Sequence, residues 1–393
     1  MDANVVTAVN SLTSRWAHTL APGNTVISGL GLWPLLALLA TAADEPGRTE
    51  LGEAVGVDPS TAASQAVELI GALDETADLH AALGLWVHQQ LKLSESFGEV
   101  LPTELTGTLV GDPSVDKANL DAWVADHTNG LIREMPLELT PDLVLVLASA
   151  LSLQTTWARP FREQIKHVHE GDWAGSWHWL DRTDSDLDAL RVHDDPVAGA
   201  LTVVTVAGDA DVDVVLAVAS PEAPQADVLS ALLAAIADPE GGRPGSALLR
   251  QAEQGQQVAP AVTLAQTTAP APDLTLALPS FSVSADHDLL ALRSLFGLTA
   301  VTTDPGDQGH FSAISPDPLA VGQANQSVLA RFHATGFEAA AITAIGMTRA
   351  AALRPSSPRL AVALTQPFAF TAVHRPTGLP VVTGWIQTPT EPE

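Results

Sequence analysis

An apolar run from Leu143 to Leu153 sets the first limit on the fold. Almost every residue in it is hydrophobic, and a strand that is buried on both faces loses the polar alternation of a half-exposed strand. We therefore expect this run to be a central strand of a large sheet. Hydrophobic residues make up 46% of the chain and charged residues only 16%, so there is enough apolar material to cover both faces.

Helical patterns fill the first third of the chain, and strand patterns fill most of the rest. Apolar residues bounded by Gly, Pro or Asp predict helices at Val5–Leu20, Trp33–Thr41, Arg48–Val55 and Thr61–Leu73. Short apolar runs predict further strands at Val212–Ala219, Leu274–Leu278, Leu360–Leu364, Phe368–Val373 and Val381–Ile386. The longest apolar run, Leu30–Ala43, is shorter than the ~20 residues of a membrane helix and is interpreted as a buried core helix.

The chain has 393 residues, a length that would suit two or three domains of roughly 150 residues. However, no linker separates halves with independent patterns, so we expect a single domain over residues 1–393. The stretch Pro239–Asp273 mixes Gly, Pro and Gln, which predicts a surface insertion.

Charge and composition exclude several classes of function. Eighteen Lys and Arg face 46 Asp and Glu, and the formal net charge of −28 argues against nucleic acid or an anionic membrane surface as partner. The chain has no Cys, which excludes disulfides, thiolate metal sites and a cysteine nucleophile. The N-terminal residues lack a basic segment followed by a cleavage site, which is compatible with a cytoplasmic protein or with one whose signal was trimmed, and leaves the location open.

Motifs of known enzymes are incomplete. Ser114 and Lys117 match the S-x-x-K of serine β-lactamases, but no lysine is followed by the Thr-Gly of the partner motif. His169-Glu170 lacks the second histidine of H-E-x-x-H, and Gly29-x-Gly31 lacks the third glycine of a dinucleotide loop. We therefore expect no catalytic residues and no cofactor.

Residues 167–188 contain side chains that could bind a metal ion and aromatic rings on which a ligand could stack. Two histidines share one strand face and four aspartates follow them: His167, His169, Asp181, Asp184, Asp186 and Asp188. A calcium loop that began at Asp181 would need glycine at position 186, so we interpret the aspartates as a solvated loop and expect no metal. Trp173, Trp177 and Trp179 are interpreted as buried packing.

A segment near the C-terminus fits neither a plain helix nor a plain loop. Read with period two, Gly336–Met347 has one face that is mostly apolar and small near its start, and residues 348–358 look like an exposed loop. A short helix followed by a linker is the other interpretation of this segment.

Several weak motifs, in order over nearly the whole chain, resemble the serpin family. They are Asn24–Leu32, Thr49–Leu51, Trp123, Thr128–Ile132, Leu147–Ala150, Trp157, Pro160-Phe161, Leu278–Phe281, Phe311–Ile314, Glu338–Ala341 after Gly336, Pro367–Phe370, Gly384 and Pro389. The chain is thus similar to a divergent, prokaryotic-type serpin.

The resemblance implies a fold and a mechanism. The fold is a single α+β domain with three mixed or antiparallel sheets, about nine α-helices and an exposed reactive-centre loop at about 336–358. The loop is the bait for a serine protease, and after cleavage its first part inserts as a new strand into the central sheet of a metastable native state. The implied inserting residues are Gly336, Phe337, Glu338, Ala339, Ala340, Ala341, Ile342, Thr343 and Ala344.

The resemblance also implies which residues control sheet opening. Ser28, Gly31, Ser149 and Gln326 occupy the polar network that holds the central sheet closed, and Trp157 marks the breach region at its end. Ser149, Gln326 and Gly31 stand where the family has Asn, His and Ser. Phe337 stands where inhibitors have Thr or Ser, and its volume is expected to slow insertion.

The position of the bait bond is left open. The usual family spacing from Gly336 gives Ala350-Ala351, which suits an elastase-like or subtilisin-like protease. A loop shorter by one residue gives Arg349-Ala350 and a trypsin-like target, and Arg354-Pro355 is a third alternative.

Two functions follow from the resemblance. The first is an irreversible inhibitor of a serine protease that acts as a monomer without a cofactor. The second is a non-inhibitory binding or scaffold protein of the same fold, for which Phe337, Ser149 and Gln326 argue. An extracellular location is the alternative that the family implies.

Overall fold

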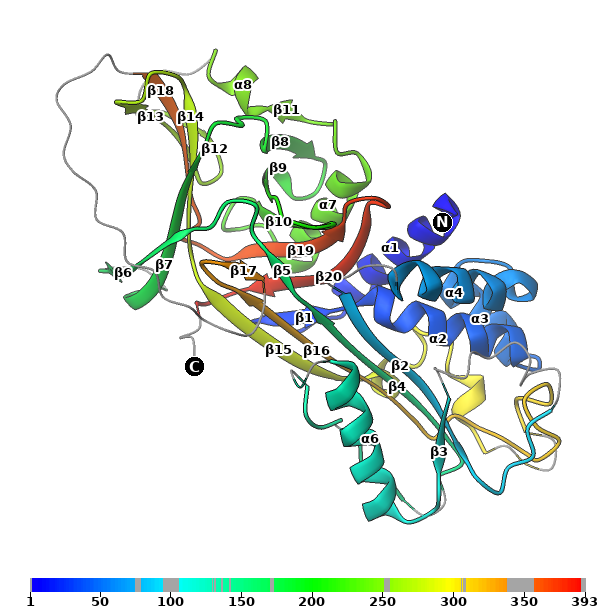
Figure 1. Cartoon of the computed structure of the whole chain (residues 1–393). Helices are drawn as coiled ribbons and strands as arrows, with labels where there is room; N and C mark the ends of the chain where they lie inside the picture. The colour runs from blue at the N-terminus through cyan, green and yellow to red at the C-terminus, as the bar shows by residue number, and fades with distance from the viewer. Residues whose placement is uncertain are drawn as a thin grey trace. The chain divides into compact units, whose positions relative to one another are not determined.

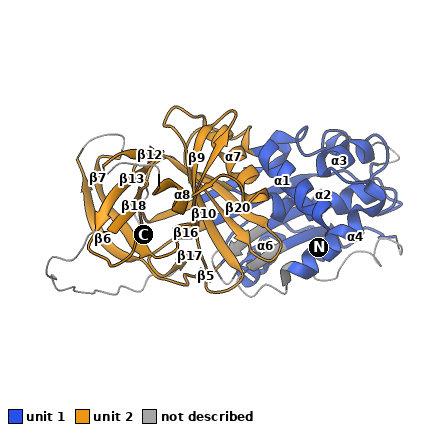
Figure 2. Cartoon of the chain, turned by 90° about the horizontal axis from the view of Figure 1, so that it is seen from above, with its two compact units in different colours: residues 1–16, 27–153, 284–329 blue, residues 17–26, 154–283, 330–393 orange. Residues whose placement is uncertain are grey.

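The computed structural model describes residues 2–74, 79–94, 106–128, 130, 132–135, 137–140, 143–169, 173–250, 255–304, 306, 309–337 and 357–389. The chain divides into two compact units, coloured blue and orange in Figure 2. Unit 1 comprises residues 1–16, 27–153 and 284–329, and unit 2 comprises residues 17–26, 154–283 and 330–393.

Unit 1 contains most of the helices (Figure 1). They are α1 (Ala3–Ala17), α2 (Gly29–Ala42), α3 (Gly47–Val55), α4 (Pro59–Asp74) and α6 (Pro113–His127), with short 3₁₀ turns at Leu289–Leu292 and Ala300–Thr302. The four helices predicted in the first third of the chain are confirmed. Helix α2 carries no charged residue and is buried along almost its whole length, so the apolar run is a core helix as expected.

The strands of unit 1 form one side of the central sheet, in the order β3, β2, β4 and β16. Their bounds are Thr106–Leu109, Leu79–His88, Leu145–Leu153 and Gln323–Phe332. Strand β4 pairs with β2 on one side and with β16 on the other. Its successive residues Leu145, Val146, Leu147 and Ala148 are at most 2% exposed. The expected central strand, buried on both faces, is therefore confirmed.

Unit 2 contains a seven-stranded sheet in the order β1, β20, β19, β10, β9, β8 and β11. The bounds of these strands are Thr25–Ile27, Leu379–Ile386, Phe368–His374, Val212–Val218, Gly199–Val206, Leu190–Asp195 and Arg243–Pro244. Helix α7 (Gln225–Ala237) packs on one face of this sheet, where Leu229 and Leu232 are fully buried.

Unit 2 also contains a six-stranded sheet in the order β12, β13, β18, β14, β7 and β6. The bounds are Gln257–Ala259, Val262–Thr267, Ser357–Ala363, Asp273–Pro279, Gly175–Asp184 and Arg162–Val168. Two short strands, β5 (Thr155–Thr156) and β17 (Gly336–Phe337), join the end of β16, and β15 (Phe281–Asp288) pairs with β16 as well. A one-turn helix, α8, spans Gly245–Leu248.

The interpretation of Pro239–Asp273 as a surface insertion is wrong for much of that stretch. Strand β13 hydrogen-bonds to both β12 and β18, and β11 pairs with β8. Val262 and Leu264 are buried and Thr263 between them is exposed, although the alternation is lost at Gln266, which is exposed, and at Thr267, which is buried. The first four residues of β13 thus have the period of a strand, which the surrounding Gly, Pro and Gln had obscured.

The architecture is α+β with three sheets, as the resemblance implied. Seven α-helices lie within the residues that the structure describes, compared with the nine or so expected. None of those helices is both long and apolar enough to cross a bilayer.

Candidate functional site

The four residues of the expected sheet-opening network lie together in unit 1, at the start of α2. Ser28 caps α2, and its Oγ accepts a hydrogen bond from the Gly31 N–H at 2.9 Å. The Gln326 side chain on β16 binds the Ser28 backbone twice: Oε1 accepts from the N–H and Nε2 donates to the carbonyl, both at 2.9 Å. The Ser149 hydroxyl on β4 donates to the Gly31 carbonyl at 2.6 Å. One helix end thus binds side chains from two neighbouring strands.

These contacts lie on the ladder that joins β4 to β16. Ser149 is the register partner of Gln326 in this parallel pair, and both side chains have no exposed surface. Separating β4 from β16 takes these two residues apart, and each is held to the same turn of α2. Hydrogen bonds buried this deeply have no water to replace them, so they favour the closed sheet.

Gly31 fits this network because a side chain there would press on its hydrogen-bonding groups. A Cβ at position 31 would lie 3.0 Å from the Ser149 Oγ and 3.2 Å from the Gln326 Nε2. Serine, the residue of the family pattern, would crowd both groups. The substitutions at 31, 149 and 326 therefore form a mutually compatible set, and their role in sheet opening remains a prediction.

Replacing Gln326 by Leu should weaken the closed sheet. The change keeps the side-chain volume roughly constant but removes both hydrogen bonds to Ser28, which costs about 2 kcal/mol. We expect a lower urea midpoint for the first unfolding transition, followed by tryptophan fluorescence. The control is Gln323→Leu on the same strand, where the side chain is half-buried. An equal loss in both variants would show that the Ser28 contacts are not special.

Trp157, the residue expected to mark a breach region, lies in unit 2. The Trp157 indole Nε1 donates to the His333 carbonyl at 2.8 Å, and its backbone N–H donates to the Thr335 carbonyl at 3.0 Å. The Phe161 N–H donates to the Ala334 carbonyl at 2.7 Å. The turn that follows β16 is thus fixed by three hydrogen bonds from residues 157–161.

Phe337 lies in an aromatic cluster at this turn. Its side chain is 1% exposed, and its ring centroid is 6.4 Å from that of Phe332 and 6.2 Å from that of Phe370. Phe281 stacks on Phe332 at 5.3 Å, and Trp157 lies 4.6 Å from Phe332. Phe337 thus already lies between β16 and β5. Its effect on the rate of insertion stays a prediction.

His333 was not predicted from the sequence, and it lies inside the same turn. Its backbone N–H donates to the Gly336 carbonyl at 2.9 Å, which closes the hairpin from β16 to β17. Its Nε2 is buried and makes no hydrogen bond within the described residues. Burial, together with the positive charge of Arg331, lowers the pKa of His333, although Glu163 acts in the opposite direction.

The lowered pKa of His333 predicts a loss of stability in acid. Below about pH 6.5 the unfolded chain binds a proton that the folded site resists, so folding becomes less favourable until the pH reaches the folded pKa. His193 and His374 have lowered pKa values for the same reason, burial. We expect the thermal midpoint to fall between pH 7 and pH 5, and to fall less in His333→Gln. His127→Gln, at an exposed site on α6, should follow the wild type, and a His333→Gln curve of unchanged slope would contradict the assignment.

The remaining inserting residues and the bait bond lie outside the described residues. They are Glu338, Ala339, Ala340, Ala341, Ile342, Thr343, Ala344, Arg349, Ala350 and Ala351. The structure places Gly336 and Phe337 in β17, and it resumes at Ser357, the first residue of β18.

The enzyme-like motifs have structural roles in the described residues. Ser114 Oγ donates to Asp112, the N-cap of α6, at 2.7 Å, and Lys117 pairs with Asp121 one helical turn later at 2.6 Å. Trp173 and Trp179 are buried, as expected for packing residues. Among the residues described, no group of three or more His, Asp or Glu is arranged to hold a metal ion.

Comparisons with known proteins agree with this geometry. The family model described as Serpin (serine protease inhibitor) matches residues 6–171 and 249–389. Serine proteinase inhibitor A3K of Cavia porcellus is 26% identical over 321 residues, which cover 78% of this chain and 68% of that protein. Putative serpin-Z12 of Oryza sativa subsp. japonica is 28% identical over 148 residues, 35% of each chain.

Solved structures share the fold at low sequence identity. A serpin from the trematode Schistosoma haematobium superimposes with a TM-score of 0.72 at 15% identity, covering 98% of this chain and all of that one. Thyroxine-binding globulin in complex with thyroxine gives 0.71 at 17% identity over 99% of both chains. The three sheets and their order thus define the class of fold that these solved structures share. The family match over most of its length shows that the chain belongs to the serpins.

Proposed function

We propose that this serpin inhibits a serine protease as a suicide substrate, acting as a monomer. The protease Ser Oγ attacks the carbonyl carbon of the bait bond, an ester forms, the amide C–N bond breaks, and the amine of the new N-terminus takes the proton. The freed segment after Phe337 then inserts into the central sheet before water hydrolyses the ester. Membership of the family supports the class of function, and the register of β17 supports the mechanism.

Strand β17 is the observation that carries the proposal. Phe337 pairs with Phe332 of β16 on one side and with Thr155 of β5 on the other, and Gly336 pairs with Thr156. A Cβ on Gly336 would lie 2.3 Å from the Thr155 carbonyl oxygen, so only glycine allows this close approach. The first two residues of the loop are therefore already a short central strand.

The antiparallel register can be extended along the chain residue by residue. Ala339 then faces Ala330 and Leu153, because these are the next register positions on the same face. In the same way, Thr343 faces both Gln326 and Ser149. Those two residues are partners in the present β4–β16 ladder, so the inserted strand would take the place of the contact that closes the sheet.

The residue sizes suit this register. The positions that share a face with Phe337 are small or polar, namely Ala339, Ala341 and Thr343, and that face meets the buried groups of α2. Glu338 falls on the other face, opposite Arg331. Insertion also replaces one parallel ladder by two antiparallel ladders, a net gain of backbone hydrogen bonds.

The decisive measurement compares intact and loop-nicked protein. If the loop inserts, nicking within residues 338–356 should raise the thermal midpoint by about 10 °C or more, from some ten extra hydrogen bonds at ~1 kcal/mol each. Incubation with elastase, subtilisin or trypsin should give a covalent complex that survives boiling in denaturant. Mass spectrometry of the released peptide then distinguishes Ala350-Ala351 from Arg349-Ala350 and Arg354-Pro355. An unchanged midpoint together with cleaved product alone would refute the proposal.

A charge at Thr343 should convert the inhibitor into a substrate. Thr343→Glu would place a carboxylate against Gln326 and Ser149 in the inserted state, where burying an unpaired charge is costly. We expect at least a tenfold rise in cleaved product relative to complex. Ala340→Glu is the matched control, because position 340 falls on the opposite face. Equal effects of both changes would contradict the assignment of the two faces, and a larger effect at position 340 would show that the register differs by one residue.

The second candidate is a non-inhibitory binding protein of the same fold. It is favoured by the two hydrogen bonds from Gln326 to Ser28, which hold the sheet closed. Thyroxine-binding globulin supplies a structural neighbour that is described by its ligand. This candidate predicts that nicking leaves the thermal midpoint unchanged.

A further inference from the structure

Strand β6 lies at one edge of the six-stranded sheet in unit 2. It spans Arg162–Val168 and, within the residues that the structure describes, it pairs with β7 alone. Its first four residues are exposed, and Ile165, at the middle of the strand, is 67% exposed. Among the large hydrophobic residues described, Val197 alone is more exposed, at 69%. An edge strand of this kind can pair with a strand of another chain.

The hydrogen bonds of β7 show which backbone groups of β6 point away from the sheet. The Ser280 N–H donates to the His178 carbonyl at 2.8 Å, so His178 directs its backbone groups toward the β14 side. His178 is the register partner of Ile165. Ile165 therefore directs its N–H and C=O outward, and so do Glu163 and His167, because these directions alternate along a strand.

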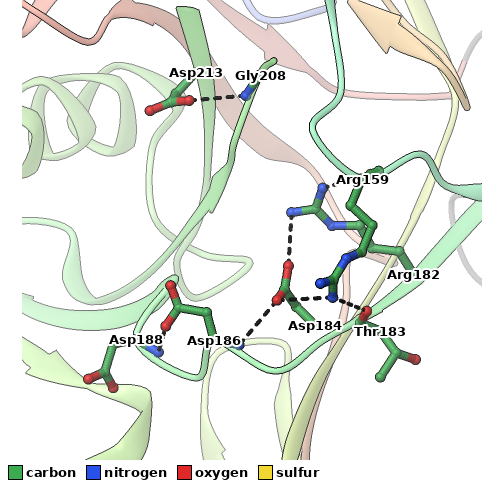
Figure 3. A network of polar contacts seen from close by, with 8 residues as sticks. All are labelled: Arg159, Arg182, Thr183, Asp184, Asp186, Asp188, Gly208 and Asp213. Atoms are coloured by element: carbon green, nitrogen blue, oxygen red, sulfur yellow. Dashed lines mark hydrogen bonds and ion pairs between the residues drawn. The ribbon is translucent and has the colours of Figure 1, made fainter. Parts of the chain in front are cut away.

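Residues just before β6 hold the strand in place and limit its free edge. The Phe161 N–H already donates to the Ala334 carbonyl, at 2.7 Å. Arg159 donates to Asp184, at the end of β7, at 3.2 Å (Figure 3). The free edge thus extends over residues 163–167, and a strand that is already ordered loses little freedom when it pairs.

The sequence of β6 is complementary to itself in one antiparallel register. A two-fold axis at Ile165 places this residue beside its own copy, so that two exposed isoleucines cover each other. The same axis places Glu163 of each copy opposite His167 of the other. On the other face, Gln164 lies opposite Lys166.

The two outer side chains of this register are already oriented by their own hairpin. Glu163 Oε1 binds His178 Nδ1 at 2.6 Å, and His167 Nδ1 binds the Ser176 hydroxyl at 2.5 Å. Within the described residues, the second Glu163 oxygen and His167 Nε2 make no hydrogen bond. Each is therefore available to the side chain opposite it in a second copy.

The neighbouring symmetric registers bring positive charges together. An axis at Gln164 would set Arg162 opposite Lys166, and an axis at Lys166 would set that residue opposite itself. Like charges in directly facing positions are destabilising. The charges of the strand therefore favour the register centred on Ile165.

The charge and size of this surface predict a weak association. The net charge of −28 makes two copies repel each other, whereas β6 itself has two basic residues and one acidic residue. A pair of five-residue edges is far smaller than the ~1,600 Å² of a standard interface. We therefore expect a dimer that forms at high protein concentration.

We propose that two copies of this chain associate through β6, in an antiparallel pair centred on Ile165 that joins their six-stranded sheets. Glu163, Ile165 and His167 of each copy form about six backbone hydrogen bonds with the other copy. Inhibition as proposed above needs one chain only, so a weak dimer is compatible with it and its test needs no protease.

Sedimentation equilibrium of the full chain tests the association. We expect the average mass to rise toward that of a dimer with increasing protein concentration, and to rise further when added salt screens the repulsion. Ile165→Lys sets two like charges face to face and should weaken the dimer roughly tenfold at an unchanged thermal midpoint. Val197→Lys makes the same change at an equally exposed position outside β6 and should follow the wild type. A chain that stays monomeric at every concentration, or an equal loss in both variants, would overturn the proposal.

Cysteine cross-linking tests the register. The chain has no Cys, so a single introduced cysteine can pair only with that of another copy. The Cα atoms of the two residues at position 165 would be about 5.5 Å apart, which is within the range of a disulfide. We expect Ile165→Cys to cross-link under mild oxidation roughly tenfold faster than Gln164→Cys, which faces position 166 instead. Equal rates would contradict the register.

Two charge variants give a readout that a purely structural role of these residues would not produce. His167→Glu sets carboxylates against each other on both sides of the axis and should weaken the dimer roughly tenfold. Adding an equal amount of the Glu163→Lys chain should restore association as a mixed pair, because the lysine introduced in one copy faces the glutamate introduced in the other. A mixture that stays monomeric would contradict the proposal.

Discussion

The buried amide of Gln326 is the contact on which the rest of the structure depends. It binds both backbone groups of Ser28 and so holds β16 against the first turn of α2. Ser149 holds β4 to the same turn through Gly31. Two adjacent strands thus share one helix end as a partner, and we expect these contacts to keep the sheet closed. A closed state of this kind can be stable without being the lowest in free energy, since opening must break several buried hydrogen bonds before any new ones form.

The short strand β17 shows where an opening would begin. It pairs on both sides, so the sheet already contains the first two residues of an added strand. Its register leads to Thr343 opposite Gln326 and Ser149. In the proposed mechanism, a small polar residue would therefore take the place of the contact between Gln326 and Ser149 after insertion.

Local patterns predicted the elements well, and long-range contacts much less well. Strand β4 and helix α2 were predicted correctly because each is buried on all sides. Such an element needs apolar residues at nearly every position, and that run is visible in the sequence. Strand β13 was missed because its alternation lies within a stretch rich in Gly, Pro and Gln. The resemblance to serpins named Gln326, but no local pattern shows that its amide reaches Ser28, about 300 positions earlier. No local pattern predicts the aromatic cluster either. Its members come together only after the strands have paired: Phe281, Phe332, Phe337 and Phe370.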